Sequence, residues 1–118
     1  MIINIRDREY EVRFGMRFLR EMDKKTYMTP AEGVKLGASM EFKVPLLFAN
    51  DTTALSEILF TGTVTEKVRP TQDMVDYFIE THPDLEGLFE EVISELKNSN
   101  ATRLKMAELE KNLEESNA

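Results

Sequence analysis

The sequence contains no cysteine, no tryptophan and only one histidine, His82. Without cysteine there are no disulfides and no thiolate metal sites, and a single histidine cannot form a histidine-based metal cluster. His82 stands directly before Pro83, at the start of a predicted helix. We therefore expect His82 to serve that turn, and the sequence gives no support for a Ser-His-Asp catalytic triad.

Long apolar runs and glycine-rich phosphate loops are also absent. No apolar run approaches the roughly 20 residues that cross a bilayer. The first twelve residues, MIINIRDREYEV, carry charges where a signal peptide has its apolar segment. Acidic pairs such as Glu90–Glu91 and Asp73–Asp76 do not have metal-ligand spacing. We expect a cytoplasmic protein that is not an enzyme and binds no cofactor and no metal.

The net charge of −7 on 118 residues is unevenly distributed. Residues 71–97 hold eight acidic side chains and one basic one, whereas residues 1–70 sum to +1 and residues 98–118 to −1. One segment therefore carries the whole imbalance of a chain long enough for a single domain. An acidic surface of this kind argues against nucleic acids and anionic membranes as partners.

Residues 2–14 predict a β-hairpin with its turn at Asp7–Arg8. Apolar residues alternate with polar ones on both sides of that turn, at Ile3, Ile5, Tyr10, Val12 and Phe14. The turn lacks the glycine that tight hairpins prefer. Because a lone hairpin is marginally stable in water, we expect a helix to cover its apolar face.

A helix is predicted from Gly15 to about Lys25, with one apolar side and one basic side. The apolar side contains Phe18 and Met22, spaced by four residues. The basic side consists of Arg13, Arg17, Arg20 and Lys24. Two interpretations of this basic stripe stay open: a solvated helix face, or a docking surface for an acidic partner.

The segment Thr29–Pro30–Ala31–Glu32 has the pattern of a helix start with a capping box. The predicted helix carries an apolar stripe of Leu36, Met40, Val44, Leu47 and Phe48. Pro45 should kink this helix or end its first half near Val44. The small residues Gly33, Gly37 and Ala38 would let another backbone approach one side of it.

Three further helices are expected. Asn50–Asp51 ends the preceding helix and caps a short one that Gly62 stops, and Pro70–Thr71 opens the next. The most regular helix is Pro83–Lys97. Its apolar side consists of Leu85, Leu88, Phe89, Val92, Ile93 and Leu96, and its acidic side of Asp84, Glu86, Glu90, Glu91 and Glu95.

The composition changes after Asn98, where aromatic and β-branched aliphatic residues end. Met106, Leu109 and Leu113 form a stripe too short for a coiled coil. We therefore predict a globular helical domain over residues 1–98 and a tail over residues 99–118. The tail is either flexible or becomes helical on a partner. The predicted fold is mainly α (α+β), with an N-terminal hairpin followed by about five short helices.

Three stretches resemble one known family. MIINIRDREYEVRFGMRFLREMDKK is similar to the start of the tail assembly chaperones of long-tailed phages and prophages of Gram-positive bacteria. The middle, LGASMEFKVPLLFANDTTALSEILFTGT, resembles that family's small-residue helix, apolar-Pro-apolar step and short Ala-Leu helix. LEGLFEEVISELKNSNATR resembles its closing segment, so the likeness covers most of residues 2–103.

The resemblance implies a function for the chain. Members of this family bind the tape-measure protein, help recruit tail-tube subunits in the host cytoplasm, self-associate into spirals and are absent from the finished virion. For this chain the resemblance implies a viral protein that forms a homo-oligomer and has the tape-measure and tail-tube proteins as partners. Met106, Leu109 and Leu113 are candidate client contacts in the tail.

The charge pattern suggests how copies of the chain associate. We hypothesise that Arg17, Arg20 and Lys24 of one subunit face Glu90, Glu91 and Glu95 of the next. A contact between two different patches produces rings or open helices. The alternative function is a small structural or adaptor protein, such as a tail-completion or regulatory factor with a fixed partner.

Overall fold

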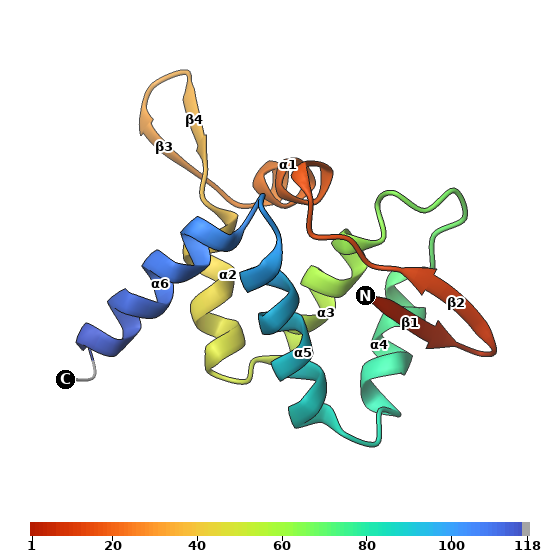
Figure 1. The fold of residues 1–118 in the computed structure, drawn as a ribbon. Helices are drawn as coiled ribbons and strands as arrows, with labels where there is room; N and C mark the ends of the chain where they lie inside the picture. Colours follow the sequence, from red (N-terminus) through yellow and green to blue (C-terminus); the bar gives the residue numbers. More distant parts are fainter. Residues whose placement is uncertain (117–118) are drawn as a thin grey trace.

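The computed structural model describes residues 1–116, apart from the side chains of residues 34 and 35. Within that range the chain forms two β-hairpins and six helices (Figure 1). The elements are β1 (Ile2–Ile5), β2 (Arg8–Glu11), α1 (Met16–Lys25), β3 (Tyr27–Ala31), β4 (Val34–Gly37), α2 (Ser39–Phe48), α3 (Thr52–Gly62), α4 (Gln72–Glu80), α5 (Leu85–Asn98) and α6 (Arg103–Ser116). The predicted fold class, mainly α with an N-terminal hairpin, is confirmed.

The first hairpin is confirmed with its turn moved by one residue. Ile5 pairs with Arg8, so the turn is Arg6–Asp7 and the predicted Asp7–Arg8 is wrong. Both turn residues have positive φ, 51° and 66°, as the two central positions of a type I′ turn require. The turn shifts because the observed register places buried Ile3 opposite buried Tyr10.

The apolar face of this hairpin lies in one continuous core with the helices. Ile3, Ile5 and Val12 are almost fully buried. The backbone of α3 comes close to the hairpin at Gly62, where a Cβ would lie 2.5 Å from Cγ1 of Val12. Gly62 is therefore required for close packing. The helical residues of this core are Phe18, Met22, Met40, Val44, Leu47, Leu55, Ile58, Leu59, Val75, Ile79, Leu88, Phe89, Val92, Leu96, Met106 and Leu109.

The predicted helix start at Thr29–Glu32 is wrong, because residues 27–37 form the second hairpin, β3–β4. Gly33 takes a φ of 76° in its turn, a left-handed conformation that favours glycine. Gly33 and Gly37 thus belong to a hairpin and not to a small-residue face of a helix. The capping pattern does not produce a helix here, because a hairpin with glycine at its turn also satisfies the backbone hydrogen-bonding groups of this segment.

Helix α2 begins at Ser39, nine residues after the predicted first helical residue, Pro30. Its first N–H and hydroxyl both donate to Oδ1 of Asp23 in α1, at 3.2 and 2.6 Å. Asp23 also packs against Gly37, where a Cβ would lie 2.4 Å from its Cγ. The capping group of α2 therefore comes from another helix, 16 residues earlier in the chain.

Of the two outcomes predicted for Pro45, a kink or an end of the helix near Val44, the structure contradicts the second. The helix continues through Pro45 to Phe48. Val44 and Leu47, on either side of the proline, are fully buried. Their packing holds the helical backbone where local propensity alone disfavours it.

The starts predicted for α3 and α4 are confirmed, whereas α5 begins at Leu85, two residues after the predicted Pro83, with Asp84 as its N-cap. Each helix begins with a side-chain oxygen that accepts a backbone N–H three residues on. Asp51 accepts from Ala54 at 2.9 Å, and the same contact occurs at Thr71 and Asp84, at 3.1 and 3.0 Å. Helix α3 ends at Gly62 as expected, and residues 63–65 continue as hydrogen-bonded turns.

The expectation of a separate tail after residue 98 differs from the structure. Residues 103–116 form α6, which packs on α2 and α5 (Figure 1). Met106 is fully buried, and the hydroxyl of Thr102 donates to the carbonyl of Leu96 at 2.5 Å. The short apolar stripe is sufficient because the body supplies a surface for it. Residues 117–118 of the predicted tail lie outside the described residues.

Ion pairs add to the attachment of α6. Nζ of Lys105 lies 2.9 Å from Glu41 of α2, and Nζ of Lys97 on α5 lies 2.7 Å from Glu110. Partial burial is the largest single influence on Glu41 and raises its pKa, but the hydrogen bond from Lys105, a backbone hydrogen bond and the charge of Lys105 together outweigh it, so this pKa lies below its usual 4.5. Hydrogen bonds to Glu41 and Glu108 raise the pKa of Lys105 above its usual 10.5.

Replacing Met106 with alanine should lower the free energy of unfolding by roughly 2–5 kcal/mol, because it leaves a cavity where α6 enters the core. Urea denaturation of purified protein measures this change. Leu104→Ala is the matched control, since Leu104 is on the same helix and 71% exposed. A flexible tail would give equal, near-zero effects for the two variants.

Replacing Lys105 with methionine should lower stability by about 0.5 kcal/mol at pH 7, a small value because both partners are partly exposed. A carboxyl whose pKa is lowered by folding stabilises the fold at pH values above its pKa in the unfolded chain. This stabilisation is lost as the pH falls through its pKa in the folded protein. A lysine whose pKa is raised by folding stabilises the fold at pH values below its pKa in the unfolded chain. This stabilisation is lost as the pH rises through its pKa in the folded protein. Denaturation at pH 7 and pH 3 should therefore show the difference only at pH 7; equal differences would contradict the ion pair.

Candidate interaction surfaces

The basic stripe lies on the exposed side of α1, opposite the buried Phe18 and Met22. Arg17, Arg20 and Lys24 are all exposed. Lys24 donates to Glu21 at 2.7 Å, and this contact lowers the pKa of Glu21. Arg17 and Arg20 form no ion pair within residues 1–116. Their charges are therefore available to an acidic partner.

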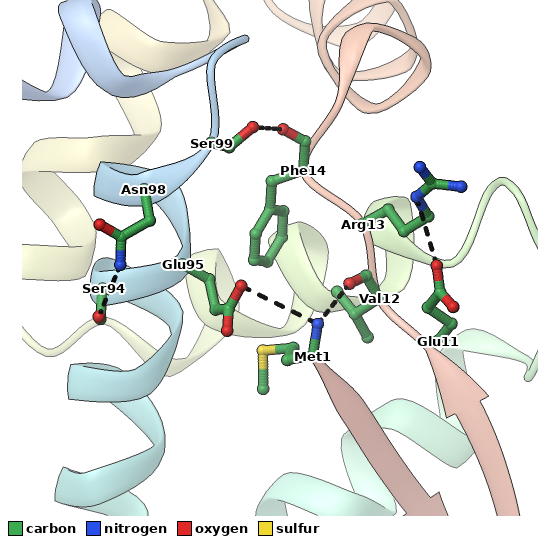
Figure 2. A network of polar contacts seen from close by, with 9 residues as sticks. All are labelled: Met1, Glu11, Val12, Arg13, Phe14, Ser94, Glu95, Asn98 and Ser99. Atoms are coloured by element: carbon green, nitrogen blue, oxygen red, sulfur yellow. Dashed lines mark hydrogen bonds and ion pairs between the residues drawn. The ribbon is translucent and has the colours of Figure 1, made fainter.

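Arg13, the fourth residue of the predicted basic stripe, precedes α1. It lies 3.3 Å from Glu11, in the segment that leads from β2 to the helix (Figure 2). The structure therefore shortens the candidate basic surface to three residues of α1.

The acidic residues of α4 and α5 form the second candidate surface. Leu88, Phe89, Val92 and Leu96 of α5 are buried, and the acidic side chains lie on the opposite, exposed side as predicted. The exposed acidic residues of the two helices and the turn between them are Asp73, Glu80, Asp84, Glu86, Glu90, Glu91 and Glu95. Repulsion among so many like charges favours a basic partner.

One of these acids already has a contact inside the chain, shown in Figure 2. The carboxylate of Glu95 lies 4.0 Å from the amino nitrogen of Met1, which donates to the carbonyl of Val12 at 3.0 Å. Close by, the hydroxyl of Ser99 donates to the carbonyl of Phe14 at 2.6 Å. These contacts join the first hairpin to the C-terminal end of α5. Glu95 is therefore partly committed to the fold.

The two charged surfaces do not neutralise each other within the described part of the chain. No ion pair joins α1 to α5 among residues 1–116, and Glu90 and Glu91 have no ion-pair partner there. A pairing between these surfaces would have to join separate molecules.

The predicted client-binding residues of the tail lie at the inner side of α6. Met106 and Leu109 are buried, and Leu113 is half-buried. Leu113 lines a hollow of about 420 Å³ with Pro45 and Phe48 of α2. Of the three, only Leu113 is accessible to a partner while α6 is in place. The stripe that suggested a client contact is the stripe that attaches the helix.

Polar residues meet between α3 and α4 at a hollow of about 310 Å³. The hydroxyl of Ser56 donates to Asp76, and Nε2 of Gln72 donates to Oγ of Ser56 at 2.7 Å. These groups satisfy one another, and Asp76 lines the hollow whereas Asp73 is not part of its lining. Within residues 1–116, no group of three or more histidine, cysteine, aspartate or glutamate side chains is placed to hold a metal ion.

His82 takes part in the turn between α4 and α5. Its Nδ1 accepts the backbone N–H of Asp84 at 3.0 Å, and its ring packs edge-on against Phe78 with centroids 5.3 Å apart. This is the turn role predicted from its position before Pro83.

Among the described residues, no helix is both long and apolar enough to cross a membrane.

Sequence reasoning missed a third surface, on the β3–β4 hairpin. This hairpin extends away from the helices (Figure 1), and every residue of β3 is exposed. Met28 and Leu36 are opposite each other in the strand register and are 52% and 55% exposed. The signal for this hairpin was Gly33, which stands between two segments of strand-forming residues.

Comparison with known proteins identifies the family. A search of curated proteins and a search of solved structures each gave no match. The family model described as "Phage tail assembly chaperone protein, TAC" matches residues 2–111. This range includes both hairpins, α1 to α5 and most of α6. The chain therefore belongs to the phage tail assembly chaperone family.

Proposed function

We propose that this chaperone binds the tape-measure protein, helps recruit tail-tube subunits and self-associates while it does so. It acts in the cytoplasm of the bacterial host and leaves before the virion is complete. The observation that carries this proposal is the family match over residues 2–111. A non-enzymatic role fits the family, since an assembly chaperone acts by binding.

The charged surfaces support a head-to-tail arrangement of subunits. Arg17, Arg20 and Lys24 of one copy face Glu90, Glu91 and Glu95 of the next. Exposed ion pairs contribute less than about 1 kcal/mol each, so the charges set how fast two subunits meet and how they are aligned. Apolar contacts have to supply most of the affinity. Because the two patches differ, repeated contacts build a ring or an open helix along a long client.

A client contact through the tail requires a change in α6. Met106 and Leu109 are buried against the body, so they reach the client only when α6 leaves α2 and α5. Leu113, which is half-buried, is accessible without this change. We propose these three residues as client contacts, of which Met106 and Leu109 become available only after release of the helix.

Co-expression with the tape-measure protein of the same gene cluster tests the client. Pull-down of the tagged tape-measure protein should retain several copies of the chaperone, because a coat along a long helical client needs many subunits. Mass spectrometry of finished particles should find no chaperone. The tag alone is the control for retention. Failure to co-purify, or a fixed copy number in the virion, would contradict the proposal and favour a structural adaptor.

Replacing Arg17 with glutamate should weaken self-association, because it places a carboxylate opposite the acidic side of α5. Light scattering across a salt titration measures the effect, and the wild-type assembly should also weaken as salt screens the charges. Lys111→Glu is a matched control, since Lys111 is exposed on α6 away from the stripe. An assembly indifferent both to salt and to Arg17→Glu would show that charge has no part in it.

A further inference from the structure

The β3–β4 hairpin, which we call the arm (residues 27–37), is fastened to the body at its base and extends beyond it. The N–H of Ala38 donates to the carbonyl of Thr26 at 3.1 Å, and Gly37 packs against Asp23. Beyond this base, Figure 1 shows the two strands standing clear of the helices. A two-stranded hairpin is marginally stable alone. Contact with another surface would stabilise this one.

The arm presents an apolar pair beside positive charge. Met28 and Leu36 form a cross-strand pair, and both are more than half exposed. At the base of the arm, Arg20 and Lys24 of α1 line a hollow of about 380 Å³ together with Asp23, Tyr27 and Gly37, so the basic side chains outnumber the single acidic one. A surface that covers the arm should therefore offer apolar side chains and negative charge together.

The opposite end of the same chain offers that combination. We call it the acidic corner: Tyr77 and Glu80 at the end of α4, and Leu85 and Glu86 at the start of α5. Tyr77 and Leu85 are 44% and 36% exposed, and both glutamates are exposed. The guanidinium of Arg6 lies 5.1 Å from the centre of the Tyr77 ring and covers part of it. Neither glutamate forms an ion pair within the described residues.

The arm and the acidic corner cannot meet within one molecule. In Figure 1 the arm is at the top of the view and the turn between α4 and α5 is at the bottom. The molecule is 45 Å long in its largest dimension. Since the complementary surfaces lie at opposite ends of one chain, the occupant that fits the arm is a second copy of this chain.

We propose that the arm of one copy docks on the acidic corner of the next. This inference rests on the proposed self-association and supplies the apolar contact that the charged surfaces lack. Arg20 and Lys24 belong both to the basic stripe and to the base of the arm. On the other side, Glu86 in the first turn of α5 is continuous with Glu90 one turn later. One docking event therefore engages the apolar and charged parts of the interface together.

Two variants that each remove one half of the contact test the proposal. Met28→Asp with Leu36→Asp disables the arm, and Glu80→Arg with Glu86→Arg disables the corner. Sedimentation velocity should show each variant self-associating at least tenfold more weakly than the wild type. Val68→Asp, at an exposed apolar residue of the loop between α3 and α4, is the control and should assemble normally. Circular dichroism checks that each variant is folded. If the aspartate variant of the arm does not fold, Met28→Ser with Leu36→Ser is the milder variant that replaces it.

Mixing the two disabled variants gives the most specific result. Each mixture contains one intact arm and one intact corner, so equal amounts should form a dimer and stop there. Formation of that dimer also shows that both variants are folded. Two defective variants that do not complement each other would overturn the proposal, since they indicate an arm-to-arm contact or an unrelated site.

The remaining outcomes separate this inference from the proposed function. A wild-type chain that stays monomeric at all concentrations overturns the proposed self-association and this inference with it. A wild-type chain that assembles, with an arm variant that assembles equally well, overturns only the docking of the arm. An arm variant that assembles normally but no longer retains the tape-measure protein overturns it too, and assigns the arm to the client.

Discussion

The apolar face of the β1–β2 hairpin has to be covered, and the helical body is built around that requirement. Two strands of four residues cannot hold themselves together in water. Gly62 lets α3 approach Val12, and Ser99 at the end of α5 bonds to the carbonyl of Phe14. Helices distant in sequence therefore converge on one hairpin. Their apolar sides face inward, and the charged sides are left for other molecules.

This arrangement explains why the basic side of α1 and the acidic side of α5 do not pair with each other within the described chain. The basic side of α1 and the acidic side of α5 both point outward, since Phe18 and Val92 point inward. The fold thus holds opposite charges on separate surfaces. A chain built this way attracts its own copies at a distance and gains affinity only where apolar groups also meet. The arm and the acidic corner bring both kinds of group to the two ends of the molecule.

Local signals in the sequence predicted the elements whose start is set by neighbouring residues. Asp51 and Thr71 each cap their own helix, so the pattern of a few residues was enough. The start of α2 was missed because its capping group is Asp23 of another helix. The arm was missed because Thr29 and Pro30 imitate a helix start while Gly33 makes the turn.

For the candidate surfaces too, features that depend on local pattern were predictable from the sequence, and features that depend on long-range packing were not. Charge sums and helical spacing correctly predicted exposed Arg17, Arg20, Glu90 and Glu91. The contact of Glu95 with the amino nitrogen of Met1 depends on tertiary packing and was not predictable. Burial of Met106 likewise depends on α2 and α5, which its own short stripe does not reveal.

We propose that two different surfaces of this chain meet between successive copies. Carbodiimide coupling, which joins an amine to a carboxylate in contact, tests it when isotopically heavy and light copies are assembled together. Mass spectrometry should then find links between Lys24 of one copy and Glu90 or Glu91 of the other. Intermolecular links that avoid both α1 and the acidic side of α4 and α5 would contradict the claim.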